Sequence, residues 1–171
     1  MNNSLPEVWL RGPIPGIPPL LQPAAHALVQ ASEDVKKYTQ DFPDSLLWEK
    51  PFGRASVGFH LQHLIGVLDR MLTYAKGKPL SEAQFTALRA EGQQNEAISS
   101  SQLVRAFDDK VKEALESFKT LSEAELPQFR TVGRKELPST VIGLLFHAAE
   151  HSQRHVGQLL VTVSAVRRER G

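Results

Sequence analysis

The chain has 171 residues, 41% of them hydrophobic, which is enough apolar material for one domain with a proper core. Its 20 basic and 19 acidic residues give a formal net charge of +1, so no basic stripe indicates nucleic-acid binding. The absence of cysteine excludes disulfides, zinc fingers, iron–sulfur clusters and cysteine nucleophiles. The N-terminus does not resemble a signal peptide, and no apolar run reaches the roughly 18 residues of a membrane span. We therefore expect a cytoplasmic protein that binds neither nucleic acid nor membranes.

The first 19 residues contain five prolines and two glycines, a composition that does not support a helix. They predict an extended N-terminal arm, which Trp9 and Leu10 are expected to attach to the rest of the molecule. We therefore divide the chain into a Pro-rich arm at residues 1–19 and one helical domain at residues 20–171.

Apolar residues at helical spacing then predict four long helices and a short one. The first long helix is expected at about residues 20–39, and the second runs from an N-cap at Ser56 to about residue 75. Ser81 begins the short polar helix, which ends near residue 89. Ser100 or Ser101 caps the next long helix, and the last spans about residues 139–166. The segment QFRTVG is the nearest to a strand and is too short to count, so the simplest architecture is an all-α four-helix bundle.

Half of the six histidines stand four residues apart in the last helix, at His147, His151 and His155. Residues at i and i+4 are neighbours on a helix surface, so two such imidazoles can chelate one ion. On a helical projection, His155 and His151 lie about 40° and about 80° from the core stripe, and His147 lies about 120° away. His147 and His155 are about 12 Å apart along the axis, too far to share an ion. The pair formed by His151 and His155 is therefore the better candidate.

A third ligand must come from another helix, and the second helix offers His60 and His63. On its projection His60 lies about 60° from the core stripe and His63 about 120°, so geometry slightly favours His60. His26 is expected to be an ordinary, partly exposed histidine. The competing interpretation is that all these rings are hydrogen-bonded beside the core without any metal. HExxH, Glu-x-x-His, a phosphate loop and a nucleophile elbow are all absent from the sequence.

Two stretches, SVGFHLQHLIGVLDRMLTYAKG and HAAEHSQRHVGQLL, make the sequence similar to the DinB/YfiT-like superfamily. The resemblance covers roughly residues 20–166. It implies a bundle of four main helices in an up-down-down-up arrangement, often assembled as a homodimer. It also implies the activity of a metal-dependent hydrolase or of a thiol transferase of the bacillithiol or mycothiol type.

The resemblance implies a metal ligand set of His63, His151 and His155. His63 stands seven residues after the helix-opening serine, and the second histidine of the last-helix pair leads into Gly157 and Gln158. The expected cofactor is a divalent metal ion, with zinc and nickel as the first choices. His60 and His147 then become neighbours of the ligands. Val156 departs from the pattern, because many relatives carry a basic residue there, so the resemblance does not extend to the substrate.

Three histidine ligands leave one coordination position open, which is typical of a catalytic rather than a structural site. The expected partner is a small-molecule substrate, for example a low-molecular-weight thiol, and no catalytic residue is assigned. Glu150 is a weak candidate for a general base and is more simply a solvated glutamate. Asp69 and Arg70 could orient a ligand, or could form an exposed ion pair. The rival hypotheses are a metal-binding or dimerising module without catalysis, and a plain helical scaffold.

Overall fold

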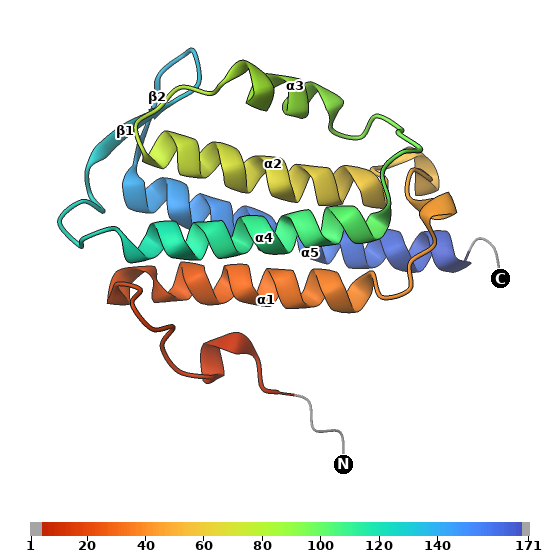
Figure 1. Cartoon of the computed structure of the whole chain (residues 1–171), viewed down its shortest axis with the longest axis horizontal. Coiled ribbons are helices and arrows are strands. Elements are labelled where there is room, and N and C mark those ends of the chain that lie inside the picture. Colours follow the sequence, from red (N-terminus) through yellow and green to blue (C-terminus); the bar gives the residue numbers. More distant parts are fainter. Residues whose placement is uncertain (1–4, 169–171) are drawn as a thin grey trace.

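A computed structural model of the chain describes residues 5–168 and is mostly helical. The four long helices lie side by side, and a short one lies beside the second of them (Figure 1). The elements in chain order are α1 (Gln22–Tyr38), α2 (Val57–Ala75), α3 (Glu82–Ala90), α4 (Ser100–Lys119), β1 (Phe129–Val132), β2 (Leu137–Thr140) and α5 (Val141–Arg168). Within the described part, no helix is both long and apolar enough to cross a membrane.

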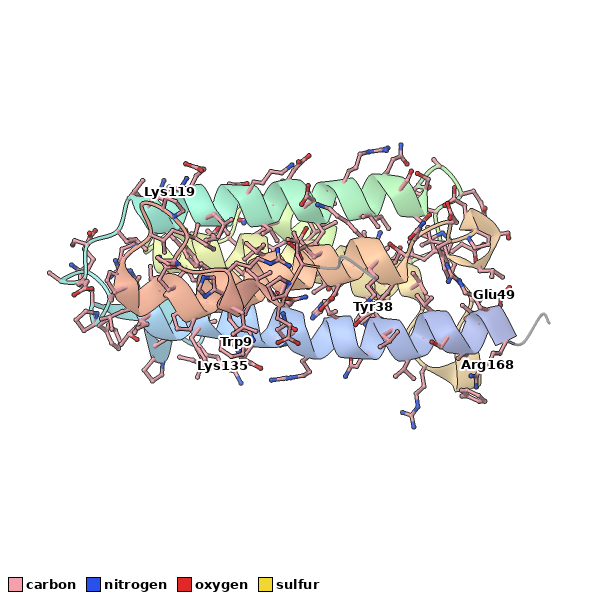
Figure 2. All side chains as sticks on the ribbon, turned by 90° about the horizontal axis from the view of Figure 1, so that it is seen from below. Trp9, Tyr38, Glu49, Lys119, Lys135 and Arg168 are labelled. Carbon is pink, nitrogen blue, oxygen red and sulfur yellow. The ribbon has the colours of Figure 1, made fainter. Side chains whose placement is uncertain are left out.

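Each of the four long helices packs against two of the others. α5 packs on α1 and α2, and α4 packs on the same two helices from the other side. α1 and α5 run in one direction, while α2 and α4 run in the opposite one (Figure 1). Accordingly, Lys119 at the end of α4 and Arg168 at the end of α5 lie at opposite ends of the molecule (Figure 2). The histidines of α2 face α5, since His60 contacts His155 and His63 contacts His151.

Serine caps define where three of these helices begin. The hydroxyl of Ser56 accepts a hydrogen bond from a backbone N–H in the first turn of α2, as predicted. Ser81 begins α3 with a reciprocal capping box, again at the predicted residue. The prediction for α4 was wrong by one or two positions, because Ser99 rather than Ser100 or Ser101 is the cap. Ser99 has glutamine three residues later, which completes a second capping box.

A small antiparallel hairpin precedes α5, so the expectation of a purely α-helical chain needs correction. Phe129 pairs with Thr140 and Val132 pairs with Leu137. The second strand continues directly into α5, whose first residue, Val141, donates its backbone N–H to the carbonyl of Gln128 at 3.1 Å. The segment QFRTVG, judged from the sequence as too short to count, contains β1. β2 was not predicted, because a run of four residues carries no strong periodic signal.

The N-terminal segment packs against α1, but through other residues than expected. Trp9 and Leu10 are exposed, whereas Val8 and Ile17 are buried. The backbone N–H of Val8 donates to the side chain of Gln30 on α1 at 3.0 Å. The two residues chosen from the sequence were therefore the wrong anchors, because the short 3₁₀ turn at residues 8–10 turns Val8 inwards. Figure 2 shows this segment over α1, with Trp9 labelled.

Candidate metal centre

The packing of α2 on α5 brings together His63, His151 and His155. The ring centroids of His63 and His155 are 4.4 Å apart, those of His151 and His155 are 4.7 Å apart, and those of His63 and His151 are 5.2 Å apart. One nitrogen from each ring lies within 4.8 Å of the nitrogens of the other two. The i,i+4 spacing supplies two of the rings from a single face of α5, and the third crosses from α2.

The donor set of this cluster fits a transition-metal ion. Burial first, and the neighbouring His63 next, lower the pKa of His151 below its ordinary value and that of His155 to about 4. Both rings are therefore neutral at physiological pH and keep the lone pair that a metal needs. The Nε2 atoms of His63 and His151 lie 2.9 Å apart, close to the edge of about 3 Å between two donors on one ion. The Nδ1 atom of His151, on the other side of this ring, is buried and has no hydrogen-bond partner among the described residues.

Glu91 determines which nitrogen of His63 faces the cluster. Its Oε2 atom lies 2.6 Å from Nδ1 of His63, and its Oε1 atom accepts a hydrogen bond from Nη1 of Arg70 at 2.6 Å. A carboxylate can only accept, so Nδ1 is the donor and the lone pair of neutral His63 is on Nε2. Burial raises the pKa of Glu91, but the hydrogen bonds from His63 and Arg70 together outweigh it and lower the pKa. A carboxylate behind a histidine in this way is typical of metal sites.

Sequence reasoning missed Glu91, because it follows α3 in a polar connection without any periodic signal. A weak signal was Gly66, three residues after His63 in the middle of a helix, where glycine is unfavourable. An ideal Cβ at this position would lie 2.5 Å from Nη1 of Arg70 and closer still to the carboxylate of Glu91. The glycine therefore leaves room for the ion pair that holds His63.

His60, which the helical projection slightly favoured, lies behind the cluster. Its side chain is only 3% exposed, and its Nδ1 atom lies 3.1 Å from Nδ1 of His155. Its Nε2 atom lies 3.4 Å from the hydroxyl of Thr162. Burial, followed by the nearby ring of His63, lowers the pKa of His60 to about 4. His60 therefore contacts His155 from the side remote from the other two rings.

His147 lies outside this cluster and belongs to a second group on the surface of α5. Its Nδ1 atom is 2.8 Å from Oε1 of Glu150, whose Oε2 atom is 2.7 Å from Nη2 of Arg154. His147, Glu150 and His151 could also hold an ion together, but this group shares His151 with the first. Glu150 is thus neither free nor simply solvated.

The remaining candidates from the sequence are engaged elsewhere. Asp69 accepts hydrogen bonds from Lys110 and Gln84 and does not contact the histidines. Its neighbour Arg70 acts on the cluster only through Glu91. His26 is partly exposed and lies 3.0 Å from the carbonyl of Gly12, as an ordinary surface histidine would.

Two comparisons with known proteins complement this geometry. The family model described as the DinB superfamily matches residues 27–159 of the chain. The matched range includes all three clustered histidines and Glu91. A comparison with curated proteins gave no match.

Proposed function

Because the chain belongs to the DinB superfamily, we propose that it binds one divalent metal ion through His63, His151 and His155 and acts as a metal-dependent enzyme. The single observation that carries the proposal is the group of three ring nitrogens within 4.8 Å of one another, contributed by two facing helices. The directions of the four long helices support the up-down-down-up bundle as part of the same proposal (Figure 1).

Three protein ligands leave a coordination position for a small-molecule substrate. A bound zinc or nickel ion would supply a Lewis acid that lowers the pKa of a water molecule or of a substrate thiol. The protein's own residues hold and orient the ring donors, since Glu91 fixes His63 and His60 contacts His155. The two carboxylates that contact histidines, Glu91 and Glu150, are both engaged by arginines. This favours a reaction in which the ion, rather than a free carboxylate, activates the nucleophile, as hydrolysis and thiol transfer both allow.

Elemental analysis of the purified protein tests the ligand set. We expect about one divalent ion per chain in the wild type, and a loss of most of it in alanine variants of His63, His151 and His155. His26→Ala is the control, because it removes a histidine that lies outside the cluster and contacts the carbonyl of Gly12. Full occupancy in His151→Ala, or loss in His60→Ala but not in His63→Ala, would refute the assignment.

A second experiment separates the two reactions. With cobalt in the site, a low-molecular-weight thiol should produce an intense sulfur-to-metal charge-transfer band if the protein transfers thiols. Absence of the band, together with ester or amide cleavage that disappears in His155→Ala, would favour hydrolysis. If the ion is instead fully coordinated by protein side chains, the protein is a metal-binding or dimerising module without catalysis.

A further inference from the structure

A pocket lies on the other side of His60 from the three-histidine cluster. It has a volume of about 560 Å³ and opens between α5 and the turn at Pro51–Gly53, towards the end of α5 that Figure 2 marks with Arg168. This volume is in the range of small-molecule sites. His60 and Thr162 line it, and His60 in turn contacts His155. A molecule in the pocket would thus be one side chain away from the cluster.

The charges around this pocket are all positive. Arg54 and Arg154 line it, and no acidic side chain does so among the described residues. Arg154 uses Nη2 to bind Glu150. The backbone N–H of Arg54 donates to the carbonyl of Pro51, whereas its guanidinium has no hydrogen-bond or ion-pair partner in the described part of the chain. The rest of the lining is mainly apolar and includes Phe52 and Val161. The unpaired guanidinium of Arg54, with Arg154 shared with Glu150, lies beside an apolar wall and matches a ligand that has a negative charge and an apolar body.

Two residues at the pocket are unfavourable for stability: Phe52 because of its backbone conformation, and Gly157 because it is a glycine inside a helix. Phe52 has a φ of +54°, in the left-handed region that a bulky residue rarely adopts, and its side chain is 85% exposed. Gly157 lies within α5, although nothing is within 4 Å of a Cβ placed there and alanine would suit the helix better. Phe52 adds an aromatic wall, and Gly157 leaves the pocket open. The left-handed backbone at Phe52 and the glycine within α5 both cost stability, and a bound ligand would give each of them a role.

We propose that this pocket, lined by Phe52, Arg54, His60, Arg154, Val161 and Thr162, binds a small organic anion with an apolar body. Binding of the anion depends only on the pocket. Its role as the substrate of the metal centre rests on the proposed function. The ligand class combines a carboxylate or similar anionic group for the arginines with an aromatic or aliphatic portion for Phe52 and Val161.

A pair of probes with the same apolar body tests the proposal. Binding of 4-phenylbutyrate and of the neutral 4-phenyl-1-butanol is measured by calorimetry with the full chain as purified. We expect the anion to bind about tenfold more tightly than the alcohol, the factor that corresponds to 1.4 kcal/mol. Arg54→Gln should weaken the anion about fivefold and leave the alcohol unchanged. Arg105→Gln, an exposed arginine on α4, is the control and should change neither.

Two further variants distinguish the pocket from a structural effect. Gly157→Leu fills the open space without a clash at Cβ, so it should abolish binding of both probes while thermal unfolding stays cooperative. Phe52→Gly relieves the left-handed backbone and should raise the unfolding temperature, yet weaken both probes. Equal binding of the two probes by the wild type, or binding that survives Gly157→Leu, would overturn the proposal.

The same samples separate this proposal from the proposed function. A wild type that prefers the anion but carries no metal supports the pocket and refutes the metal centre. A wild type that carries metal but binds the two probes equally supports the metal centre and refutes the pocket proposal. If neither probe binds and Val161→Glu converts a dimer into monomers, this face is an interface between copies and the pocket proposal is wrong.

Discussion

Replacing Glu91 with glutamine should weaken metal binding without removing any proposed ligand. The side chains of Glu91 and Arg70 are only 7% and 9% exposed, and His63 is the second partner of the same carboxylate. Both partners donate to Glu91, and glutamine offers one acceptor oxygen and one donor NH₂ group in place of two acceptors. With the oxygen kept on Arg70, the NH₂ group can pair with His63 only if Nδ1 accepts, and the ring proton then moves to Nε2 and removes the lone pair that faces the cluster. The charge that balances Arg70 disappears as well.

Two magnitudes follow from this geometry. Loss of the carboxylate behind a metal-binding histidine typically costs 10- to 100-fold in metal affinity, and we expect a value in this range for Glu91→Gln. Leaving the buried guanidinium of Arg70 without its counter-ion should also lower the free energy of unfolding by about 2–3 kcal/mol. A double variant, Arg70→Met with Glu91→Gln, should recover much of this stability and little of the affinity.

The assay is competition for zinc between the metal-free protein and a chromophoric chelator, alongside urea unfolding. Glu150→Gln is the matched control, since Glu150 also pairs with one histidine and one arginine, but in the group that contains His147. We expect the control to keep its affinity within about twofold, because His147 is not a proposed ligand. If Glu150→Gln loses zinc affinity and Glu91→Gln does not, the ion is held by the group that contains His147 and not by the cluster that contains His63.

Three further predictions test other parts of the structure. His147→Ala should keep its metal within error in elemental analysis, and a loss as complete as that of His151→Ala would contradict this. Alanine in place of glycine usually raises the free energy of unfolding of a helical protein by about 1 kcal/mol. In parallel urea titrations, Gly157→Ala should show this gain and Gly66→Ala should not, because a Cβ at residue 66 meets Glu91 and Arg70. Equal gains would show that the space beside Gly66 is not restricted. Burial raises the pKa of Asp108, but hydrogen bonds from Lys36, Lys112 and Ser32 outweigh it and hold this pKa far below its usual range. The Asp108 carboxylate therefore adds to the free energy of unfolding above about pH 4, and this stabilisation is lost as the pH falls below that value. Asp108→Asn should therefore lose about 1 kcal/mol at pH 7 and much less at pH 2.5, and equal losses would exclude this ion pair as the cause.

The helices could be predicted because their signals are local. Apolar spacing located each long helix, and Ser56 and Ser81 marked two starts, since a cap depends only on the next three residues. Features that need a distant partner could not be predicted in this way. The hairpin consists of two four-residue strands that are recognisable only once they pair. Val8 is buried because a short turn directs it towards α1, and the apolar character of Trp9 and Leu10 gave no hint of this.

In the candidate site, too, local features could be predicted from the sequence and features that need a distant partner could not. The spacing of His151 and His155 already indicated a chelating pair, because both lie on one helix. The choice between His60 and His63 depends on how α2 is rotated against α5, which a helical projection does not contain. The family resemblance implied His63, whose ring nitrogen lies within 4.8 Å of those of His151 and His155. Glu91 comes from a connection with no pattern of its own. It became visible only when the tertiary structure placed it between His63 and Arg70.

The position of Glu91 directly after α3 makes that short helix part of the histidine cluster's support. α3 has no buried residue, and it is attached to α2 through hydrogen bonds from Gln84 and, just beyond its last turn, through Glu91. Order in the crossover and orientation of His63 are thus linked, so that an ion bound at the proposed site would tighten the crossover and a lifted crossover would loosen the ion. The interior of α3 is free to vary in sequence, provided that its two ends still reach α2. A surface segment without a core of its own would in this way act on a half-buried histidine cluster through one side chain.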